Sequence, residues 1–264
     1  MVEAIEHARP RLGRLGTSVH YFPTVGSTND IAATLAQSAS TGDVEGAVVI
    51  ADAQTAGRGR RGRDWLSPPG GGLYVSLVLT PGRAPVDGPR ATALLTLAAG
   101  VALAEAVETA TGLGVDVKWP NDLHVSGRKL AGILAEAASG QSGTPPIVLG
   151  YGVNLGPMAY PPDLRDRATS LESELGRPVD RILVFIETLA AMARRYDDLL
   201  NGRFDAILDA WRAKAPASVG ARVSWTTASG PRDGVTAGLD DQGALLVKVG
   251  GHTERIIAGE VNWL

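Results

Sequence analysis

The sequence predicts an α+β protein in which helices pack against a β-sheet and a small β-barrel follows at the C-terminal end. Short apolar runs typical of buried strands, such as 46–51, recur beside long alanine- and leucine-rich stretches typical of helices, such as 90–111. Beyond Ala215 the pattern changes to short strands separated by turn signals. We therefore expect one large domain over residues 1–215 and a small β-barrel domain over residues 216–264.

The first half of the chain contains a helix that we expect to follow a cluster of hydroxyl and amide side chains. Ser27 or Thr28 is a good N-cap, because its side-chain oxygen can accept a hydrogen bond from the first turn. Residues 1–20 are weakly patterned, with a short helix and a basic tail. The elements predicted up to residue 111 are strands at 19–22, 46–51 and 73–80 and helices at 29–38 and 90–111.

The second half begins with a strand that runs into a proline, and a turn follows at Ser126-Gly127-Arg128. Two amphipathic stretches then predict helices, and the remaining residues alternate in short β-forming runs. The predicted elements are strands at 114–119 and 147–155, an apolar run at 130–137, helices at 181–200 and 204–214, and short strands at 222–226, 234–239, 244–249 and 254–258.

The composition excludes several classes of protein. The chain has 264 residues, a net charge of −3 and 44% hydrophobic residues, which fits a globular protein rather than a general nucleic-acid binder. It has no cysteine, so disulfides, thiolate metal sites and cysteine nucleophiles are excluded. Four scattered histidines and the lack of a Gly-x-Ser-x-Gly motif argue against zinc and acyl-serine chemistry. Because we see neither a signal peptide nor an uninterrupted apolar run of membrane-spanning length, we expect a cytoplasmic protein without a membrane partner.

A loop rich in glycine and arginine follows the strand at 46–51. Residues 57–63 hold four arginines and three glycines. Glycine lets the backbone approach a ligand closely, and arginine presents a fixed charge with paired donors suited to carboxylate or phosphate. We therefore expect an anion-binding loop that is mobile until it orders around its ligand. A solvated basic turn or a nucleic-acid patch would have the same composition.

Four polar clusters stand at the predicted strand ends or in the turns beside them. Each is weak evidence alone, and Ser27-Thr28-Asn29 taken by itself is better explained by helix capping. Taken together and in this order, they match the motif pattern of a known family. The clusters are Ser27-Thr28-Asn29, Gln54 with the arginine loop, Lys118 to Asp122 with Lys129, and Asn154.

Five segments carry motifs that are specific when they occur together. They are Gly26 to Asn29, Gln54 to Trp65, Lys118 to Asp122, Gly127 to Leu134, and Gly152 to Leu155. Over about residues 20–264, the chain resembles the biotin–protein ligases, or biotin–[acetyl-CoA-carboxylase] ligases. The resemblance implies a mixed β-sheet with flanking helices, as in class II synthetases and in the catalytic domains of biotin and lipoate ligases. Some members of that family carry an N-terminal DNA-binding domain and act as repressors; this chain has no room for one, so we expect the short, ligase-only form without a specific DNA partner.

The resemblance implies a two-step reaction with biotin and ATP as substrates. Biotin's carboxylate attacks the α-phosphate of ATP to give biotinyl-5′-AMP and pyrophosphate, and a lysine of a biotin carboxyl carrier domain then takes the biotinyl group and releases AMP. Two unit charges 4 Å apart repel by about 4 kcal/mol at an effective dielectric constant near 20. Positioned cations and Mg²⁺ must offset that repulsion, and we expect Mg²⁺ to be held mainly through the ATP phosphates.

By the same resemblance, Lys129 and Arg60 are the expected catalytic residues, because both should lie at the bond that forms between biotin and the α-phosphate. The residues expected to bind biotin are Ser27, Thr28, Asn29, Gln54, Arg58, Gly59, Arg60 and Lys129. The residues expected to bind the nucleotide are Arg58, Arg60, Arg63, Trp65, Asn121, Lys129 and Asn154.

Several roles stay open on the sequence alone. Arg61 and Arg63 are either pyrophosphate contacts or solvated charge, and Trp65 either stacks on the loop or adenine or packs in the core. Asp122 assists Mg²⁺, activates the incoming lysine or caps its turn, while Trp119 is expected to pack beneath the biotin pocket. The acceptor protein, the role of the terminal barrel and the pairing of two chains through sheet edges are also undecided.

Three other functions compete with a biotin ligase. A lipoate or octanoyl ligase shares the fold class and the lysine, but the full arginine loop and the segment from Lys118 to Asp122 favour biotin. A nucleic-acid-binding module would use the basic loop and the small barrel. An inactive biotin sensor would bind without turnover, although Lys129 and the arginines are intact.

Overall fold

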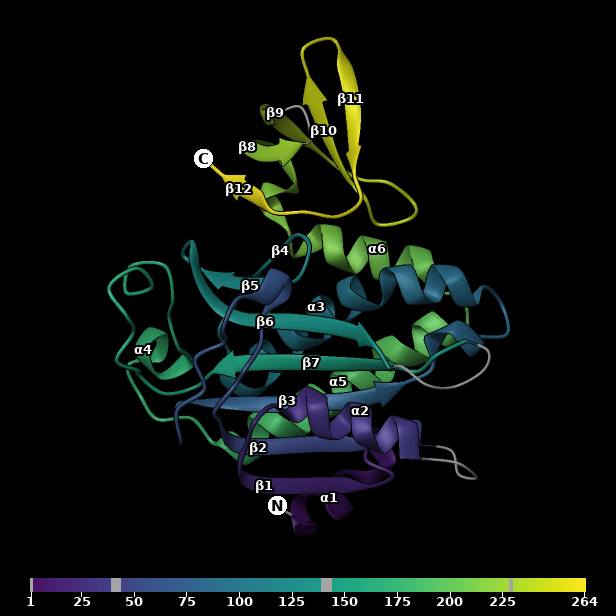
Figure 1. The fold of residues 1–264 in the computed structure, drawn as a ribbon, viewed down its shortest axis with the longest axis vertical. Coiled ribbons are helices and arrows are strands. Elements are labelled where there is room, and N and C mark those ends of the chain that lie inside the picture. Colours follow the sequence, from purple (N-terminus) through teal and green to yellow (C-terminus); the bar gives the residue numbers. More distant parts are fainter. Residues whose placement is uncertain (1, 39–43, 139–143, 228–229) are drawn as a thin grey trace.

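The computed structural model describes residues 2–38, 44–138, 144–227 and 230–264. A seven-stranded sheet forms its centre, with the strand order β1-β2-β3-β7-β6-β5-β4 (Figure 1). β1 and β2 are parallel and every other neighbouring pair is antiparallel, so the expected mixed sheet is confirmed. The strands are β1 (Val19–Val25), β2 (Val48–Gln54), β3 (Gly72–Leu79), β4 (Asp116–Lys118), β5 (Asp122–Val125), β6 (Arg128–Ala137) and β7 (Ile147–Asn154).

Helices cover the sheet on both faces. They are α1 (Val2–Ala8), α2 (Thr28–Ser38), α3 (Gly88–Thr111), α4 (Leu171–Leu175), α5 (Arg181–Leu200) and α6 (Phe204–Ala213), with 3₁₀ turns η1 (Arg9–Arg11), η2 (Arg60–Gly62), η3 (Pro81–Arg83) and η4 (Pro216–Ser218). Side chains of β2 alternate between the faces: Ile50 joins the core with α3 and α5, whereas Val49 packs with Ala32 and Ala36 of α2. The strand period of two residues produces this alternation. Because α2 contacts β2, β3 and β7, it covers the part of the second sheet face that these three strands form.

Helix α3 is the central helix of the core. Asp87 caps its start by accepting a hydrogen bond from the Arg90 backbone N–H, and Gly112 ends it in the left-handed conformation. By length and composition, α3 is apolar enough to cross a membrane, but 72% of its most apolar stretch is buried within the fold. Small residues in α3 let β4 pack closely against it. At Gly100, for example, an added Cβ would lie only 3.1 Å from Val117 Cγ1. These observations are those of a core helix.

The C-terminal strands form a second, five-stranded antiparallel sheet in the order β11-β10-β9-β8-β12. They are β8 (Val219–Thr227), β9 (Gly230–Leu239), β10 (Leu245–Val249), β11 (His252–Ile256) and β12 (Val261–Trp263). Among the described strands, β11 and β12 are the two edges and do not pair, so the expected closed barrel is wrong. With only three residues, β12 pairs with β8 alone and is too short to complete a barrel wall.

The terminal sheet is tied to the rest of the chain by specific contacts. Arg90 Nη2 donates to the Asp241 carbonyl at 3.0 Å, and Trp119 Nε1 donates to the Gly243 carbonyl at 3.0 Å; both carbonyls lie in the turn between β9 and β10. Trp119 is buried, as expected, but its indole points its donor at the terminal sheet. That residues 1–215 and 216–264 are separate domains stays a prediction.

The predicted helices are confirmed, and α5 has the predicted bounds of 181–200. Three short elements were missed: β5 with four residues, α4 with five and β12 with three. Each is too short to show the period of its own pattern, so its neighbours in space decide its conformation. The strand predicted at 114–119 is limited to β4 for the same reason.

Candidate active site

Glycines form the floor of the candidate site on β6 and β7. A Cβ at Gly152 would lie 2.3 Å from Trp65 Nε1, and one at Gly132 would lie 3.0 Å from Trp65 Cζ3. A Cβ at Gly150 would lie 2.2 Å from Asn29 Oδ1. Any larger residue would therefore displace the indole or the amide, which explains why these strands carry glycine despite its cost in a strand interior.

A buried polar corner lies beside this floor at the start of α2. The Thr28 backbone N–H and Oγ1 both donate to Gln54 Oε1, at 2.9 and 3.1 Å. Gln54 Nε2 in turn donates to Ser67 Oγ at 2.9 Å. The structure thus joins Thr28 and Gln54, two of the residues predicted to bind biotin, through contacts that helix capping alone would not require, and it buries Ser27 beside Thr28.

Ser76 and Glu136 complete this corner and were missed from the sequence. Ser76 Oγ donates to Asn29 Oδ1 at 2.6 Å and lies 2.8 Å from Thr28 Oγ1. Asn29 Nδ2 donates to Glu136 Oε2 at 2.6 Å. Ser76 interrupts the apolar run of β3, and Glu136 interrupts the apolar run at 130–137, but one polar side chain in such a run is too weak a signal to mark a site.

Replacing Ser76 by alanine is expected to lower the free energy of unfolding by about 1–3 kcal/mol, because buried polar groups of Asn29 and Thr28 lose a partner. Urea denaturation of the variant checks this. Ser18→Ala, at an exposed serine, is the control and should stay within about 0.5 kcal/mol of the unaltered chain. A Ser76→Ala variant as stable as the control would show that the network contributes little.

The arginine loop is folded as a small hairpin. The Gly59 N–H donates to the Arg63 carbonyl at 2.7 Å, and Arg58 and Asp64 form an isolated antiparallel bridge. At its tip, Arg61 and Gly62 both have positive φ angles, of 60° and 73°. The mobility expected for this loop stays a prediction; equal protease sensitivity with and without biotinyl-5′-AMP would contradict it.

Arg58 connects the loop to the polar corner. Its guanidinium makes ion pairs with Asp30 Oδ1 at 2.7 Å and with Glu136 Oε2 at 3.3 Å. Burial alone would lower the pKa of Arg58, but the hydrogen bonds to Asp30 and Glu136 outweigh it and raise the pKa above its usual value. Arg58 is therefore held as a cation directly above Asn29 and its neighbours.

Lys129 extends its ammonium group over Trp65. Its Nζ lies 5.4 Å from the Trp65 ring centroid and 2.7 Å from Asp122 Oδ1. Its backbone is held on one side by the loop before α4, because its N–H donates to the Arg167 carbonyl at 2.7 Å and its carbonyl accepts from the Thr169 N–H at 2.9 Å. The ammonium is thus positioned by a cation–π contact and a carboxylate, with a third of the side chain exposed.

Arg60 and Asn121 lie on the other side of the loop. Arg60 Nη1 donates to Asn121 Oδ1 at 3.0 Å, and Asn121 Nδ2 donates to the Ile133 carbonyl at 2.8 Å. Burial lowers the pKa of Arg60 from its usual value, which marks it as the partly desolvated arginine of the loop. A cavity of about 480 Å³ opens beside these residues, between α3, β6 and the terminal sheet.

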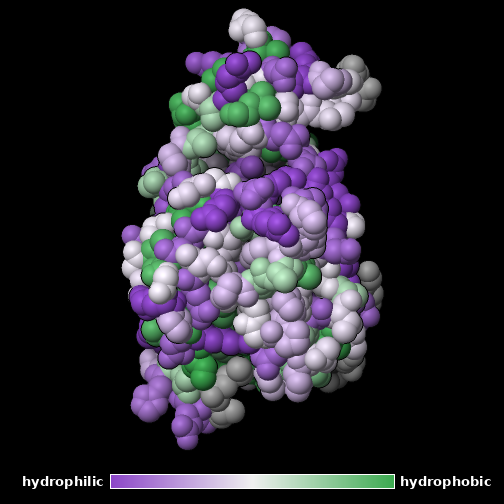
Figure 2. All heavy atoms as spheres, turned by 90° about the vertical axis from the view of Figure 1, so that its left-hand side faces the viewer, coloured by the Kyte–Doolittle hydropathy of each residue, from purple (hydrophilic) through white to green (hydrophobic). Residues whose placement is uncertain are grey.

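Asn154 lies at the end of β7, where it is buried and donates from Nδ2 to the Thr169 carbonyl at 2.9 Å. It therefore supports the segment that holds the Lys129 backbone. The end of β7 and the start of β6 lie on the left of Figure 1, and Figure 2 shows hydrophilic residues gathered on that side of the molecule, below the terminal sheet.

His124 stands beside this cluster on β5, paired across the strands with Lys129. Its Nδ1 lies 3.1 Å from the Gly127 carbonyl, which fits an Nδ1–H tautomer, and its buried Nε2 has no hydrogen-bond partner among the described residues. Burial, followed by the charge of Lys118, lowers the pKa of His124 below its usual value. The imidazole is consequently neutral at pH 7.

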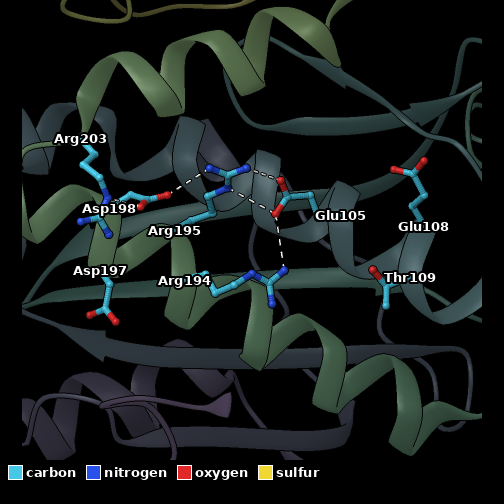
Figure 3. Close-up of a pocket in the computed structure, with 8 residues that line it drawn as sticks. All are labelled: Glu105, Glu108, Thr109, Arg194, Arg195, Asp197, Asp198 and Arg203. Carbon is cyan, nitrogen blue, oxygen red and sulfur yellow. Dashed lines mark hydrogen bonds and ion pairs between the residues drawn. The ribbon is translucent and has the colours of Figure 1, made fainter. Parts of the chain in front are cut away.

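A larger cavity of about 660 Å³ lies between α3 and α5, away from the arginine loop (Figure 3). Glu105 makes ion pairs with both Arg194 and Arg195, and Asp198 makes ion pairs with Arg195 and Arg203. Every charged residue that lines it has an ion-pair partner within the described part of the chain. We assign no ligand to this cavity, because its charges already neutralise one another.

Comparisons with known proteins agree with this fold, which is that of a ligase. The model of the Biotin/lipoate A/B protein ligase family matches residues 21–154. The biotin--[acetyl-CoA-carboxylase] ligase of Mycobacterium tuberculosis is 37% identical over 242 residues, which cover 89% of this chain and 85% of that protein. The bifunctional ligase/repressor BirA of Bacillus subtilis is 34% identical over 250 residues, covering 94% of this chain and 74% of that protein.

A solved structure agrees over the same extent. The biotin protein ligase from Aquifex aeolicus in complex with biotin and ATP is similar with a TM-score of 0.79 and 27% identity, covering 94% of this chain and 99% of the other. The chain therefore belongs to the biotin/lipoate A/B protein ligase family.

Proposed function

We propose that this chain is a biotin–protein ligase, which activates biotin with ATP as biotinyl-5′-AMP and transfers the biotinyl group to a lysine of a carboxylase carrier domain. The observation that carries the proposal is the Lys129 ammonium above Trp65 and the glycine floor, with the arginine loop beside it. The relatives from M. tuberculosis and A. aeolicus, whose names specify biotin, support this choice within the family.

In the first step, a carboxylate oxygen of biotin attacks the α-phosphorus of ATP, and the bond to the β-phosphate breaks to release pyrophosphate. Both reactants are anionic, so the chain must supply positive charge where they meet. We assign this role to Lys129 and Arg60, of which Arg60 is the partly desolvated arginine of the loop. In the second step, the neutral lysine amine attacks the carbonyl carbon of the anhydride, the bond to AMP breaks, AMP leaves, and the nitrogen loses one proton to become the amide N–H.

The biotin side of the site is assigned to the polar corner and the first part of the loop. A buried ureido group needs donors and acceptors, since each unpaired polar group costs about 1–3 kcal/mol. The linked hydroxyl and amide groups at the start of α2 supply both kinds. The proposed biotin-binding residues are Ser27, Thr28, Asn29, Gln54, Arg58, Gly59, Arg60 and Lys129.

The nucleotide side is assigned to the loop arginines and to the ends of β6 and β7. The proposed residues are Arg58, Arg60, Arg63, Trp65, Asn121, Lys129 and Asn154. Within the described ranges, no three His, Asp or Glu side chains gather as a metal site, so Mg²⁺ would be held mainly by the phosphates, where it would neutralise developing charge. The proposed setting is the cytoplasm, where ATP is available, and the two proposed domains are residues 1–215 and 216–264.

The function is tested by incubating the chain with ATP and one carboxylic acid at a time and measuring the pyrophosphate released. We expect release with biotin and little with lipoate or octanoate, because the polar corner offers more donors and acceptors than an aliphatic or dithiolane chain can use. Adding a carrier domain should then yield a biotinylated lysine, detected by mass spectrometry. Release with lipoate but not with biotin would make the chain a lipoate ligase, and tight duplex DNA binding without any release would favour the nucleic-acid module.

Arg60→Ala is expected to weaken retention of biotinyl-5′-AMP about tenfold to a hundredfold, the range of one lost charge-assisted hydrogen bond. The readout is the fraction of adenylate that escapes into solution after single-turnover formation. Arg212→Ala removes the same charge from an exposed arginine of α6, outside every proposed site, and serves as the control. If adenylate escaped equally from both variants, Arg60 would have no special place at the reacting bond.

A further inference from the structure

Glu260, in the turn between β11 and β12, makes an ion pair with Arg63 of the arginine loop. Arg63 and Glu260 lie far apart in the sequence, and their contact joins the terminal sheet to the arginine loop. The hydrogen bond from Arg63 lowers the pKa of Glu260, and the charges of Arg61 and Arg167 lower it further. Glu260 is therefore an anion that several cations surround.

The same carboxylate also acts on cations that face the reacting centre. Burial lowers the pKa values of Arg60 and Lys118, and the charge of Glu260 opposes that effect on both residues. Asp122, which is paired with Lys129, is the other anion that acts on Arg60 and Lys118. The cations around Glu260 are Arg60, Arg61, Arg63, Lys118 and Arg167.

The two carboxylates, Glu260 and Asp122, cannot neutralise these five cations. Arg61 and Arg167 are exposed, and their side chains make no hydrogen bond or ion pair with any residue that the structure describes. Convergent guanidinium and ammonium groups of this kind suit a polyphosphate, which offers several charges and many acceptor oxygens. Glu260 contributes a single negative charge to this cluster through its pair with Arg63.

We propose that Glu260 is a competing counter-ion at the polyphosphate end of the nucleotide: its carboxylate pairs with Arg63 among several other cations, and pyrophosphate must displace it. This inference rests on the proposed function and assigns a role to the terminal sheet. It also assigns Arg61 and Arg167 to binding of the pyrophosphate leaving group. Neither residue is among those proposed above to bind biotin or the nucleotide. Glu260 thereby weakens the hold of the site on pyrophosphate and favours its release.

Binding of inorganic pyrophosphate to the full-length chain, measured by titration calorimetry, tests this role. Glu260→Gln is expected to bind pyrophosphate about fivefold more tightly than the unaltered chain, the factor that corresponds to about 1 kcal/mol for a partly exposed charge pair. The difference should shrink in high salt, because screening weakens interactions between exposed charges. A gain in affinity is informative, since structural damage would instead weaken binding.

Glu254→Gln is the matched control. Glu254 lies on β11 of the same sheet and makes ion pairs with Arg232 and His252 rather than with the loop. Its replacement removes one negative charge from the sheet and should leave pyrophosphate affinity unchanged. Glu260→Asp retains the charge on a shorter side chain and should lie between Glu260→Gln and the unaltered chain.

Unchanged or weaker binding by Glu260→Gln, or no binding by any form, would overturn the role given to Glu260. So would an equal gain in Glu254→Gln, because the effect would then come from net charge alone. The titration needs no biotin, so its outcome is independent of the proposed activity. Failure of the unaltered chain to release pyrophosphate with biotin would instead reject the activity.

Discussion

Replacing Lys129 by alanine is expected to lower the rate of biotin-dependent pyrophosphate release by about a thousandfold, the loss typical of removing a group that stabilises transition-state charge. The ammonium stands over Trp65 and the glycine floor, where carboxylate and α-phosphate are proposed to meet. Stopped-flow or single-turnover measurement of pyrophosphate gives the rate directly. Lys129→Arg should recover part of it, because charge is kept while the position of the donors changes.

The control must separate loss of charge from loss of fold. Lys214→Ala removes a lysine that pairs with Glu108 near the helical side of the sheet, and it should keep full activity. Loss of Lys129 also leaves Asp122 without its cation, so Lys129→Ala/Asp122→Asn should be as inactive as the single variant while unfolding at the normal temperature. A Lys129→Ala enzyme with near-normal turnover would remove this lysine from the mechanism.

Gly152→Ala is expected to lower the same rate by about a hundredfold, because a shift of 1 Å in a reacting group can cost that much. The added methyl group would lie 2.3 Å from Trp65 Nε1, so the indole under Lys129 has to move. Gly114→Ala is the control: its Cβ would meet nothing within 4 Å and its φ angle needs no glycine. That variant should be fully active.

A double-mutant cycle identifies the cause of the Gly152 effect. If the methyl group acts by colliding with the indole, its cost in unfolding free energy should largely disappear in a Trp65→Ala background. Additive costs would show that the methyl group disturbs the strand itself. Thermal unfolding of the two single variants and the double variant supplies the three values needed.

The sequence predicted the fold wherever an element is long enough to show its own period. The helix at 181–200 has the predicted bounds, and the strand at 147–155 differs from β7 by one residue at its end. The prediction of a terminal barrel was wrong, because closure depends on whether β11 and β12 pair. A sequence rich in short strands fits an open sheet equally well. The short elements β5 and β12 were missed because their neighbours decide them.

The residues of the candidate site also fall into those that the sequence could reveal and those that it could not. Residues in contiguous motifs, such as Thr28, Gln54 and Lys129, could be found because several unusual residue types stand close together in the chain. Ser76 and Glu136 could not be ranked above other polar residues, since each is a single side chain in an apolar strand. Their contacts with Asn29 arise only when α2 is placed on the sheet.

The sequence by itself determined the positive charge of the loop, its glycine-rich backbone and the presence of Lys129 after the turn at 126–128, because these are local properties of residue type. Only the tertiary structure decided which anion faces each cation: Asp30 and Glu136 face Arg58, and Glu260 faces Arg63. The physical reason is that electrostatic interaction depends on distance in space and on burial, and separation along the chain specifies neither.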